Sequence, residues 1–301
     1  RAARSIAAVK LGNLLGDLGS HDEATSLYEE SLRIDRDLAA AYPLDPSILD
    51  QLTWSYERVS ERCLSLGDTS RALELSSLRI RACEQLLALD PARVESLYAA
   101  VCADNVDRKI RIHTGASRRS PQEWEEILGR VSDLVQRRPD DGGYQTLYIQ
   151  SLLNSADEAV VAGFTAQSER YLDEAQPLID RFLKTDPSDT RALLVAGRAE
   201  RSRIFMLWGS PDRTAVLPHI HSVMDLARRR LELNPSGGDS VAEYAADVRD
   251  MVWRLNALGD LSAARSLHSS LVAMLIPFTE APRRTPGAME HLAGILLECP
   301  F

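Results

Sequence analysis

Six glycines recur along the chain at a nearly constant interval. Successive members are separated by 48, 48, 48, 46 and 50 residues, and they are Gly19, Gly67, Gly115, Gly163, Gly209 and Gly259. An internal period of this length is typical of a repeat array, in which each repeat contacts only its neighbours. The period therefore favours one extended array over the two compact domains that 301 residues would otherwise suggest.

A small residue stands five positions after every glycine. The members of this column are Ala24, Ala72, Ser120, Ser168, Thr214 and Ala264. Two packed helices approach closely where the side chains between them are small, so the column predicts a helix crossing in every repeat.

Prolines punctuate each repeat 24 to 27 residues after the glycine, at Pro46, Pro91, Pro139, Pro187 and Pro235. Asp or Asn precedes all of them except Pro139, and such a pair predicts a helix with proline at its first position. A glycine in the left-handed conformation commonly ends a helix. Each repeat is therefore interpreted as helix A, a glycine turn, helix B and a proline turn.

Apolar residues between these turns keep helical spacing, as in the stripe Leu11, Leu14, Leu15 and Leu18. We predict A helices over residues 3–18, 47–66, 92–114, 143–162, 188–208 and 239–258. We predict B helices over residues 22–41, 69–88, 121–137, 166–184, 214–232 and 261–279, and a last A helix from about Pro286.

Four positions depart from this regular pattern. Pro177 lies inside a B helix and should kink or break it. Pro218 should make its B helix start late, and the helix after Pro139 should begin only after residues 140–143. The turn from Thr114 to Pro121 is longer and more polar than the others, which predicts a mobile loop.

The expected fold is an all-α, right-handed superhelical α-solenoid that forms one domain over residues 1–301. The repeats are expected at residues 3–45, 46–90, 91–138, 139–186, 187–234 and 235–281, with a partial repeat at 285–301. The chain begins at Arg1 without Met, and the next glycine would fall near residue 307, beyond Phe301. We therefore expect a fragment of a larger protein.

The columns resemble the tetratricopeptide repeat, whose pattern includes Leu-Gly, Gly, Ala, an aromatic residue and Pro. The first repeat carries Leu11-Gly12, Leu15, Gly19, Ala24, Tyr28 and Ser31, the second carries "LGDTSRALE" and "LLALDP", and the sixth carries "LGDLSAA". The usual repeat has about 34 residues. The excess of roughly 14 residues equals about four helical turns, so we expect each helix to be about two turns longer.

A narrower resemblance concerns the C-terminal arrays appended to some bacterial Ser/Thr protein kinases, through "LGDTSRALE", "LLALDP" and the closing "LLECPF". It implies a regulatory array attached to a catalytic domain. The chain itself contains no His-Arg-Asp, Asp-Phe-Gly or glycine-rich phosphate loop.

The tetratricopeptide resemblance also implies a concave groove lined by the A helices. Residues six and ten positions before the turn glycine would project into it. The predicted partner-binding residues are Asn13, Glu57, Glu61, Asn105, Lys109, Asp157, Arg203, Arg249 and Trp253, and Val9, Leu153 and Ala199 complete the two columns. Their mixed charge suits a peptide or helix with its own charge pattern and does not match the carboxylate clamp of chaperone-binding members. Ordinary solvent exposure would explain the same polarity.

Composition limits the other function classes. A formal charge of −9 and a pI near 5.3 argue against nucleic-acid binding, and no apolar stretch is long enough to span a bilayer.

The cysteines have no metal or disulfide spacing, which indicates reduced thiols in the cytoplasm; they are Cys63, Cys83, Cys102 and Cys299. His219 and His221 point about 200° apart on a helix, so one metal ion does not take both.

No catalytic signature is present, and neither a cofactor nor a metal is expected. The arginine runs at residues 228–230, 118–119 and 283–284 are either solvated faces and helix-end contacts or a site for an acidic or phosphorylated partner. The sequence therefore predicts a non-catalytic protein-binding scaffold or regulatory module. The alternatives are a ligand-sensing array that controls an attached catalytic domain, which a buried polar pocket between A helices would favour, and an all-α enzyme.

Overall fold

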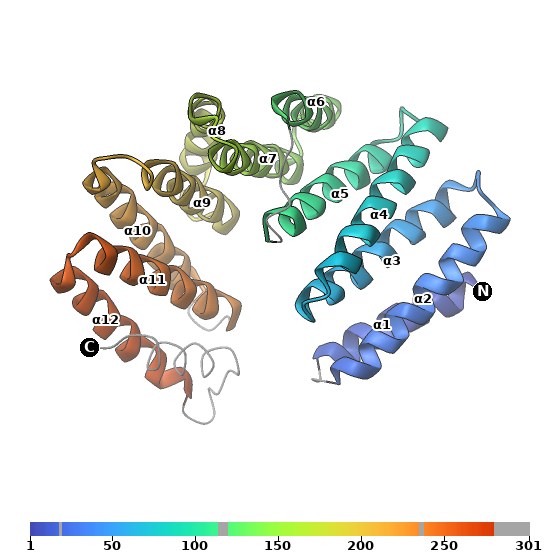
Figure 1. Cartoon of the computed structure of the whole chain (residues 1–301), viewed down its shortest axis with the longest axis horizontal. Coiled ribbons are helices and arrows are strands. Elements are labelled where there is room, and N and C mark those ends of the chain that lie inside the picture. Colours follow the sequence, from blue (N-terminus) through green and yellow to red (C-terminus); the bar gives the residue numbers. More distant parts are fainter. Residues whose placement is uncertain (18–19, 114–119, 235–237, 280–301) are drawn as a thin grey trace. The chain divides into compact units, whose positions relative to one another are not determined.

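A computed structural model describes residues 1–17, 20–113, 120–234 and 238–279. This part of the chain is helical and contains no strand. The elements are α1 (Ala2–Asp17), α2 (His21–Ala41), α3 (Pro46–Ser65), α4 (Thr69–Leu89), α5 (Val94–His113), α6 (Pro121–Arg137), α7 (Gly142–Val161), α8 (Thr165–Thr185), α9 (Thr190–Leu207), the short 3-10 helix η1 (Arg213–Val216), α10 (Leu217–Leu233), α11 (Gly238–Leu258) and α12 (Leu261–Thr279). Odd-numbered α-helices are the A helices and even-numbered ones the B helices (Figure 1).

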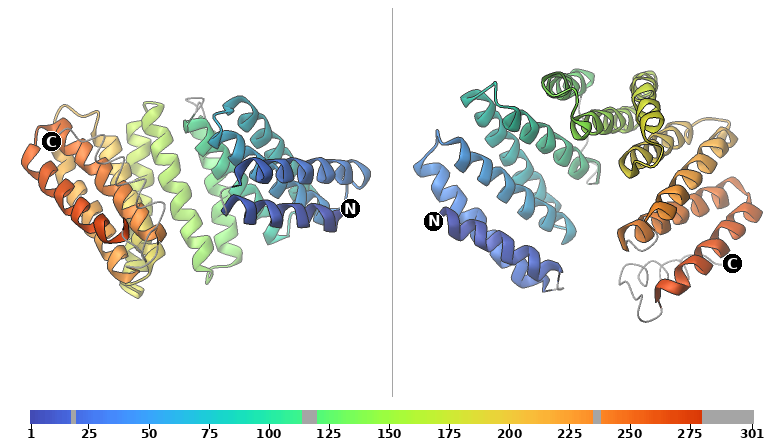
Figure 2. Two further views of the ribbon diagram at one scale, coloured as in Figure 1. Left: turned by 90° about the horizontal axis from the view of Figure 1, so that it is seen from below. Right: turned by 180° about the vertical axis from the view of Figure 1, so that it is seen from behind.

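The helices form two compact units, Arg1–Asn154 and Ser155–Phe301, and the division falls within α7. In the first unit α2 packs between α1 and α3, and α4 packs between α3 and α5 (Figures 1 and 2). In the second unit α9 packs against α8 and α10, and α11 against α10 and α12. The predicted all-α solenoid of helical hairpins is thus confirmed within each unit. Its extent as one array over residues 1–301, and its hand across both units, stay predictions.

Apolar side chains from facing helices fill each unit. In the first unit Leu32, Leu52 and Leu75 of α2, α3 and α4 belong to one buried cluster. In the second unit Ile220 of α10 and Met251 of α11 belong to another. The amphipathic stripes of the sequence therefore supply the core, as helical periodicity predicts.

The proline turns repeat every 48 residues without variation. In each turn a backbone N–H donates across 3.2 Å to the carbonyl three residues earlier, from Asp45 to Tyr42, Arg93 to Asp90, Asp141 to Arg138 and Asp189 to Asp186. The prolines at the second position of these turns are Pro43, Pro91, Pro139 and Pro187. Proline favours this position because its ring fixes φ near −65°.

This geometry corrects two predictions about the prolines. The first member of the column is Pro43, not Pro46, although Pro46 does open α3 as predicted. Pro91 and Pro187 do not begin helices, because α5 begins at Val94 and α9 at Thr190. An Asp-Pro pair fits a β-turn as well as a helix start, and the two residues after proline decide between them.

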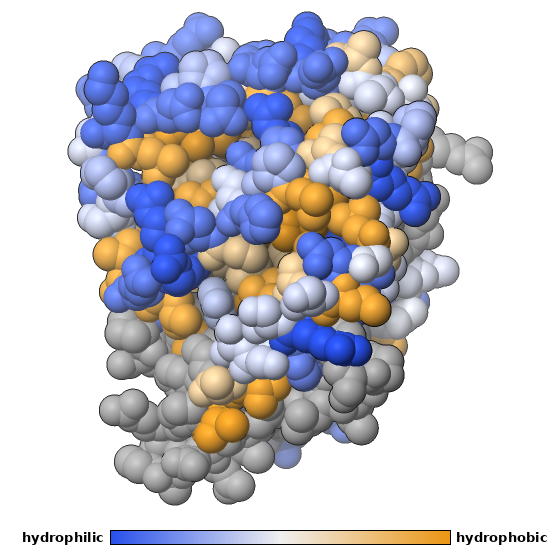
Figure 3. Space-filling model, turned by 90° about the vertical axis from the view of Figure 1, so that its left-hand side faces the viewer, coloured by the Kyte–Doolittle hydropathy of each residue, from blue (hydrophilic) through white to orange (hydrophobic). Residues whose placement is uncertain are grey.

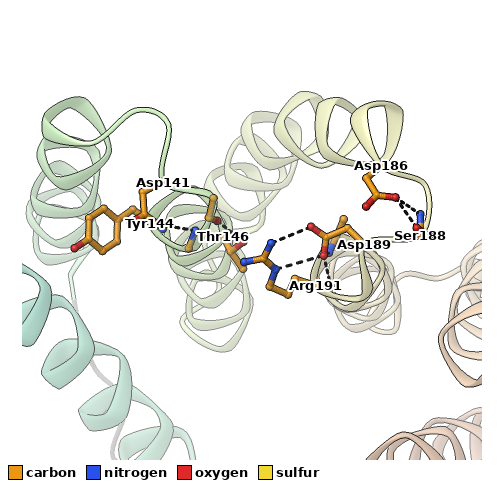
Figure 4. Close-up of polar contacts among 10 residues, drawn as sticks. Asp141, Tyr144, Thr146, Asp186, Ser188, Asp189 and Arg191 are labelled. Carbon is orange, nitrogen blue, oxygen red and sulfur yellow. Dashed lines mark hydrogen bonds and ion pairs between the residues drawn. The ribbon is translucent and has the colours of Figure 1, made fainter. Parts of the chain in front are cut away.

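Aspartates at the ends of the proline turns begin the A helices. Asp189 Oδ1 accepts hydrogen bonds from the backbone N–H groups of Arg191 (2.8 Å) and Ala192 (3.4 Å) (Figure 4). Asp141 likewise accepts from Gly143 (2.9 Å) and Tyr144 (3.3 Å). These bonds satisfy orphan N–H groups of the first helical turn. The helix α7 begins at Gly142, so it starts after Pro139 as predicted but before the end of residues 140–143.

The glycine turns confirm half of the glycine column. Gly67, Gly163 and Gly259 have φ of +80°, +83° and +83°, a region that residues with a side chain rarely adopt. Gly209 has no positive φ, so its prediction was wrong. The residue 48 positions after Gly163 is Pro211, and Gly209 lies two residues too early. Gly19 and Gly115 lie outside the described residues.

The small-residue column holds in four repeats and fails in two. Ala24, Ala72, Ser168 and Ala264 are buried. Ser120 is exposed because α6 begins one turn late; Ser120 caps α6 in a capping box with Glu123, and Trp124 is the first buried residue. Thr214 is exposed because the buried member is Val216, 48 positions after Ser168.

The remaining irregular positions gave mixed results. The helix α8 runs from Thr165 to Thr185 through Pro177, so the predicted break was wrong. Pro177 lies on the exposed side of α8, while Ala175 and Ile179 pack inward, so the backbone group that proline leaves unpaired can meet water. The late start at Pro218 is confirmed, since α10 begins at Leu217. Residues 114–119 and the helix expected from Pro286 lie outside the described part.

Candidate protein-binding face

The A helices α3, α5, α9 and α11 each have a stripe of side chains that includes exposed residues. On α3 the stripe includes Asp50, Trp54, Glu57 and Glu61, whose neighbours Leu49, Leu52 and Val59 are buried. These residues follow one another at three- or four-residue steps and therefore lie on one side of the helix. We call the exposed stripes of the A helices the A face.

The 48-residue period corrects the predicted columns in the fifth repeat. It puts Arg201 and Phe205 of α9 on the A face, in place of Ala199 and Arg203. Ala199 is buried, as is Leu153 of α7. Arg203 is half-buried and donates to Gln176 Oε1 of α8 at 3.2 Å. The error arose because the sequence columns were counted from Gly209.

Several predicted residues of the first unit make contacts within the protein. Asn13 Oδ1 accepts from the Tyr28 hydroxyl at 2.8 Å, and Asn105 Oδ1 accepts from Arg108 at 3.0 Å and Asn154 at 3.1 Å. Such contacts are those of packing residues. The side chain of Lys109 lies outside the described part of the structure.

The two predicted glutamates of α3 differ in environment. Glu61 is exposed and forms a 3.6 Å ion pair with Arg58, a contact of little energetic weight at a surface. Glu57 is mostly buried and pairs at 2.5 Å with Arg79 of α4, whose side chain is only 3% exposed. Burial raises the pKa of Glu57, and the neighbouring Arg79 partly opposes that shift.

Arg79 is a buried cation with incomplete hydrogen bonding. Within the described residues its Nε and Nη1 have no partner. Residues at the same position of the other B helices are Ser31, Ile127, Ala175, Val223 and Leu271, so the fold does not require a charge there. A buried guanidinium with unpaired donors costs free energy, so we look for a functional reason for it.

Two polar residues of α5 lie near this buried pair. The ionisable groups of Tyr98 and Cys102 both sense the charge of Glu57. The Cys102 thiol, through its charge and a hydrogen bond, raises the pKa of Tyr98 to about 12. Burial raises the pKa of Cys102 itself. A partly buried polar cluster therefore lies between α3, α4 and α5.

The second unit presents tryptophans and arginines on its A face. Trp253 of α11 is 59% exposed, and its ring centroid lies 5.8 Å from that of Trp208, which follows α9. The guanidinium groups of Arg254 and Arg213 lie 5.1 Å and 5.9 Å from the Trp208 ring centroid. Both distances are within the range of cation–π attraction. Trp208 is therefore contacted by Arg254 and Arg213, and its ring packs beside the exposed ring of Trp253.

The other predicted residues of the second unit are charged. Asp157 of α7 forms a 3.8 Å ion pair with Arg198 of α9. Arg201 pairs with Asp247, while Arg249 of α11 is exposed. The A-face stripes of α9 and α11 thus carry Arg198, Arg201 and Arg249 beside Phe205 and Trp253.

Exposure of apolar atoms alone does not identify a binding face. Figure 3, viewed from the side of α10 and α12, shows apolar side chains in several places among hydrophilic ones. Scattered apolar exposure of this kind is normal in folded proteins. Most of the exposed aromatic residues in the described part, Trp54, Tyr98, Phe205 and Trp253, lie on the A face, while Tyr42 and Phe164 lie at helix ends.

The histidines and cysteines have local roles. His219 Nδ1 lies 2.6 Å from Glu200 Oε2, and His221 is exposed. Within the described ranges, three or more potential ligand side chains nowhere gather as a metal site. Cys63 and Cys83 are buried free thiols, Cys102 is half-buried, and Cys299 lies outside the described residues.

The arginine run at residues 228–230 has a structural role in two of its members. Arg228 pairs with Asp225 at 2.6 Å, and Arg229 donates to the Pro187 carbonyl at 3.1 Å. Arg137 of α6 makes a similar bond to the Pro91 carbonyl at 3.0 Å. Arg229 and Arg137 thus each hydrogen-bond a B helix to an earlier proline turn.

The helices and their packing define the fold class: each unit is an all-α stack of tetratricopeptide-like helical hairpins with long helices. No protein-family model matches it, and no curated protein matches it in sequence. No described helix is long and apolar enough to cross a membrane.

Similar solved structures share the helical-repeat architecture. PilW, a type IV pilus biogenesis factor, is 13% identical over 96% of this chain and 98% of its own, with a TM-score of 0.41. A tetratricopeptide repeat protein of Thermus thermophilus is 17% identical over 81% of this chain and 98% of its own, with a TM-score of 0.38. One from Parabacteroides merdae is 12% identical over 98% and 99%, with a TM-score of 0.35. We base no functional argument on these similarities.

Sequence reasoning missed several exposed residues of the A face. Arg201 and Phe205 could have been found by counting from the proline column, which keeps its period where the glycine column does not. Trp54 and Tyr98 lie at other positions of the stripe, which the family pattern does not single out. The contact of Trp208 with Trp253 depends on the end of α9 and had no sequence signal.

Proposed function

We propose that the chain is a non-catalytic binding module that holds a protein or peptide segment against its A face. The supporting observation is the exposure of Trp54, Tyr98, Phe205 and Trp253 on the stripes that the B helices leave uncovered. Aromatic residues are enriched at protein interfaces, and tryptophan and tyrosine often contribute most of the binding energy.

Charge on the A face would select the partner. The α3 stripe carries Asp50, Glu57 and Glu61, while the α9 and α11 stripes carry Arg198, Arg201 and Arg249. Complementary charge on the surface of a single unit guides the approach of a suitable segment and rejects wrong partners. The predicted groove residues Asn13, Asn105, Lys109 and Asp157 enter this proposal only through their repeat position.

Nucleic acid fits this proposal poorly. The formal charge of the chain is −9, and two A-face arginines are already paired, Arg198 with Asp157 and Arg201 with Asp247. A polyphosphate backbone would be attracted by a continuous basic surface. We place the protein in the cytoplasm because its described cysteines are free thiols.

Selection of a displayed random-peptide library on the protein tests the binding function. Selected peptides should bind the Trp54→Ala or Trp253→Ala variant at least about tenfold more weakly. Arg81→Ala and Glu84→Ala, on the exposed side of α4, serve as controls and should leave binding unchanged. Peptides that respond only to the α4 changes would refute the assignment to the A face.

The ligand-sensing alternative is favoured by one observation, the buried Arg79 with two unpartnered nitrogens beside Glu57, Tyr98 and Cys102. In this alternative a small anion would pair with Arg79 and stabilise the array that controls an attached catalytic domain. The kinase attachment rests only on the sequence resemblance. Millimolar phosphate or acetate should raise the melting temperature of the protein but not of Arg79→Met, and equal shifts in both would exclude it.

A further inference from the structure

We propose that the A face of the second unit binds an acidic protein segment through one cluster, the tryptophan face, formed by Phe205, Trp208, Arg213, Arg249 and Trp253. This inference rests on the proposed function and names the partner chemistry. The segment would place an apolar side chain on Trp253 and Phe205 and carboxylates beside the arginines.

The first argument is the geometry of the aromatic residues. Phe205 and Trp253 occupy the same repeat position on α9 and α11, and they are 38% and 59% exposed. Trp208 is partly buried against the core cluster of the unit and lies 5.8 Å from Trp253 between ring centroids. A supported, exposed ring loses little side-chain entropy when a partner covers it.

The second argument is the charge around these rings. The A-face stripes of α9 and α11 carry Arg198, Arg201 and Arg249, and their charged members are arginines. Arg213 is exposed and forms no ion pair with a described residue; its guanidinium lies over Trp208. On this side the carboxylates Asp247, Asp157 and Asp250, with 14%, 26% and 39% of their side chains exposed, are each paired with an arginine. The exposed Arg213 and Arg249 therefore add positive charge beside carboxylates that are already paired.

The arginines also repel one another. The pKa of Arg198 is lowered by burial, and the nearby charge of Arg201 adds to the shift while Asp157 opposes it. The pKa of Arg230 is lowered by burial and again by Arg201. A carboxylate brought by a partner would relieve this like-charge crowding and could accept two hydrogen bonds from one guanidinium.

The third argument selects a peptide over a nucleic acid. Asp157, Asp247 and Asp250 already pair with Arg198, Arg201 and Arg254. They would repel a continuous phosphate chain, whereas separate carboxylates on a peptide can meet the exposed Arg213 and avoid them. Apolar anchors suited to Trp253 are also common in peptides.

The test uses the whole chain and three fluorescein-labelled probes: a peptide of glutamates around a central leucine pair, its lysine-for-glutamate twin, and an oligoadenylate. Fluorescence anisotropy should show that the glutamate peptide binds at least about tenfold tighter than the lysine twin. The variant Trp253→Ala should weaken the glutamate peptide by about tenfold or more, and Arg213→Gln by about threefold to tenfold.

Trp54→Ala is the matched control, because Trp54 is 48% exposed on the A face of the first unit beside carboxylates. It should change binding of the glutamate peptide less than about twofold. Arg213 is exposed and outside the core, so Arg213→Gln tests the inference even if the Trp253 variant folds poorly.

Three outcomes would overturn the inference: equal effects of Trp253→Ala and Trp54→Ala, equal or tighter binding of the lysine twin, or displacement of the peptide by oligoadenylate at lower concentration. Dependence on Trp54 alone would leave the binding function standing and reject only this site. Dependence on Arg81 or Glu84 of α4 would reject the binding function as well.

Discussion

At the residue scale, a side chain's role depends on the register of its helix. Ser120 and Ala72 occupy the same sequence column, but Ser120 caps α6 while Ala72 is fully buried in α4. The sequence could not distinguish these two roles, because a helix that begins one turn later has its apolar residues on the same side. The first buried residue of α6 is Trp124, which is 1% exposed. The small-residue column had instead predicted burial at Ser120, one turn earlier.

We predict that Trp124→Ala destabilises the protein much more than Ser120→Ala. Trp124→Ala should lower the free energy of unfolding by about 3–5 kcal/mol, because it leaves a cavity in the core. Ser120→Ala should cost only about 0.5–2 kcal/mol, since it removes the hydrogen bond from the Glu123 backbone N–H and the capping box. Urea denaturation of each variant measures both values. A larger loss for Ser120→Ala would mean that the packing register of α6 is wrong.

At the element scale, most helix boundaries could be predicted within about three residues from proline, glycine and aspartate punctuation. The glycine column misled in the fifth repeat, where Pro211 stands at the turn position and Gly209 does not need a positive φ. That error moved Arg201 and Phe205 out of the predicted site. Burial, by contrast, depends on neighbouring helices, and so Leu153 and Ala199 could not be recognised as core residues from their column alone.

The two kinds of glycine should respond differently to the same change. Gly67→Ala should destabilise by about 1–2 kcal/mol, because alanine must adopt a φ near +80° there. Gly209→Ala should be neutral or slightly stabilising, since Gly209 has no positive φ and an added Cβ would meet nothing within 4 Å. Thermal melting of the pair distinguishes them directly. Equal losses would show that Gly209 is also a conformational requirement.

At the scale of the whole molecule, the 48-residue repeat buries some polar residues at positions where several other repeats have apolar ones. Arg79 of α4 and Asp104 and Asp107 of α5 are examples, with exposures of 2%, 5% and 1%. Buried polar groups are tolerated when they are paired, as Asp104 is with Arg130 at 3.0 Å. Small and apolar positions of the repeat therefore set the packing, and we propose that the uncovered stripes set recognition.

Thiols and phenols with raised pKa values should make the folded protein less stable at alkaline pH. Burial raises the pKa of Cys83 to about 12, and the pKa values of Cys63, Cys102, Tyr98 and Tyr244 are also raised. The folded chain therefore keeps protons that the unfolded chain releases above about pH 9. Stability from these groups is complete below that pH and is lost as pH rises toward 12. At about pH 10.5, Cys83 alone should cost about 2 kcal/mol of unfolding free energy.

Urea denaturation of the wild type and Cys83→Ala at about pH 8 and pH 10.5 measures this loss. The wild type should lose about 2 kcal/mol more than the variant between the two pH values, because alanine has no thiol to ionise. The comparison uses the change in unfolding free energy with pH within each protein, so the constant loss of stability from any cavity left by alanine cancels. Cys299 and the other ionisable groups are common to both proteins and cancel as well. An identical pH slope in the two would show that water reaches the Cys83 thiol in the folded state, and that α4 and α5 pack less closely than the structure has them.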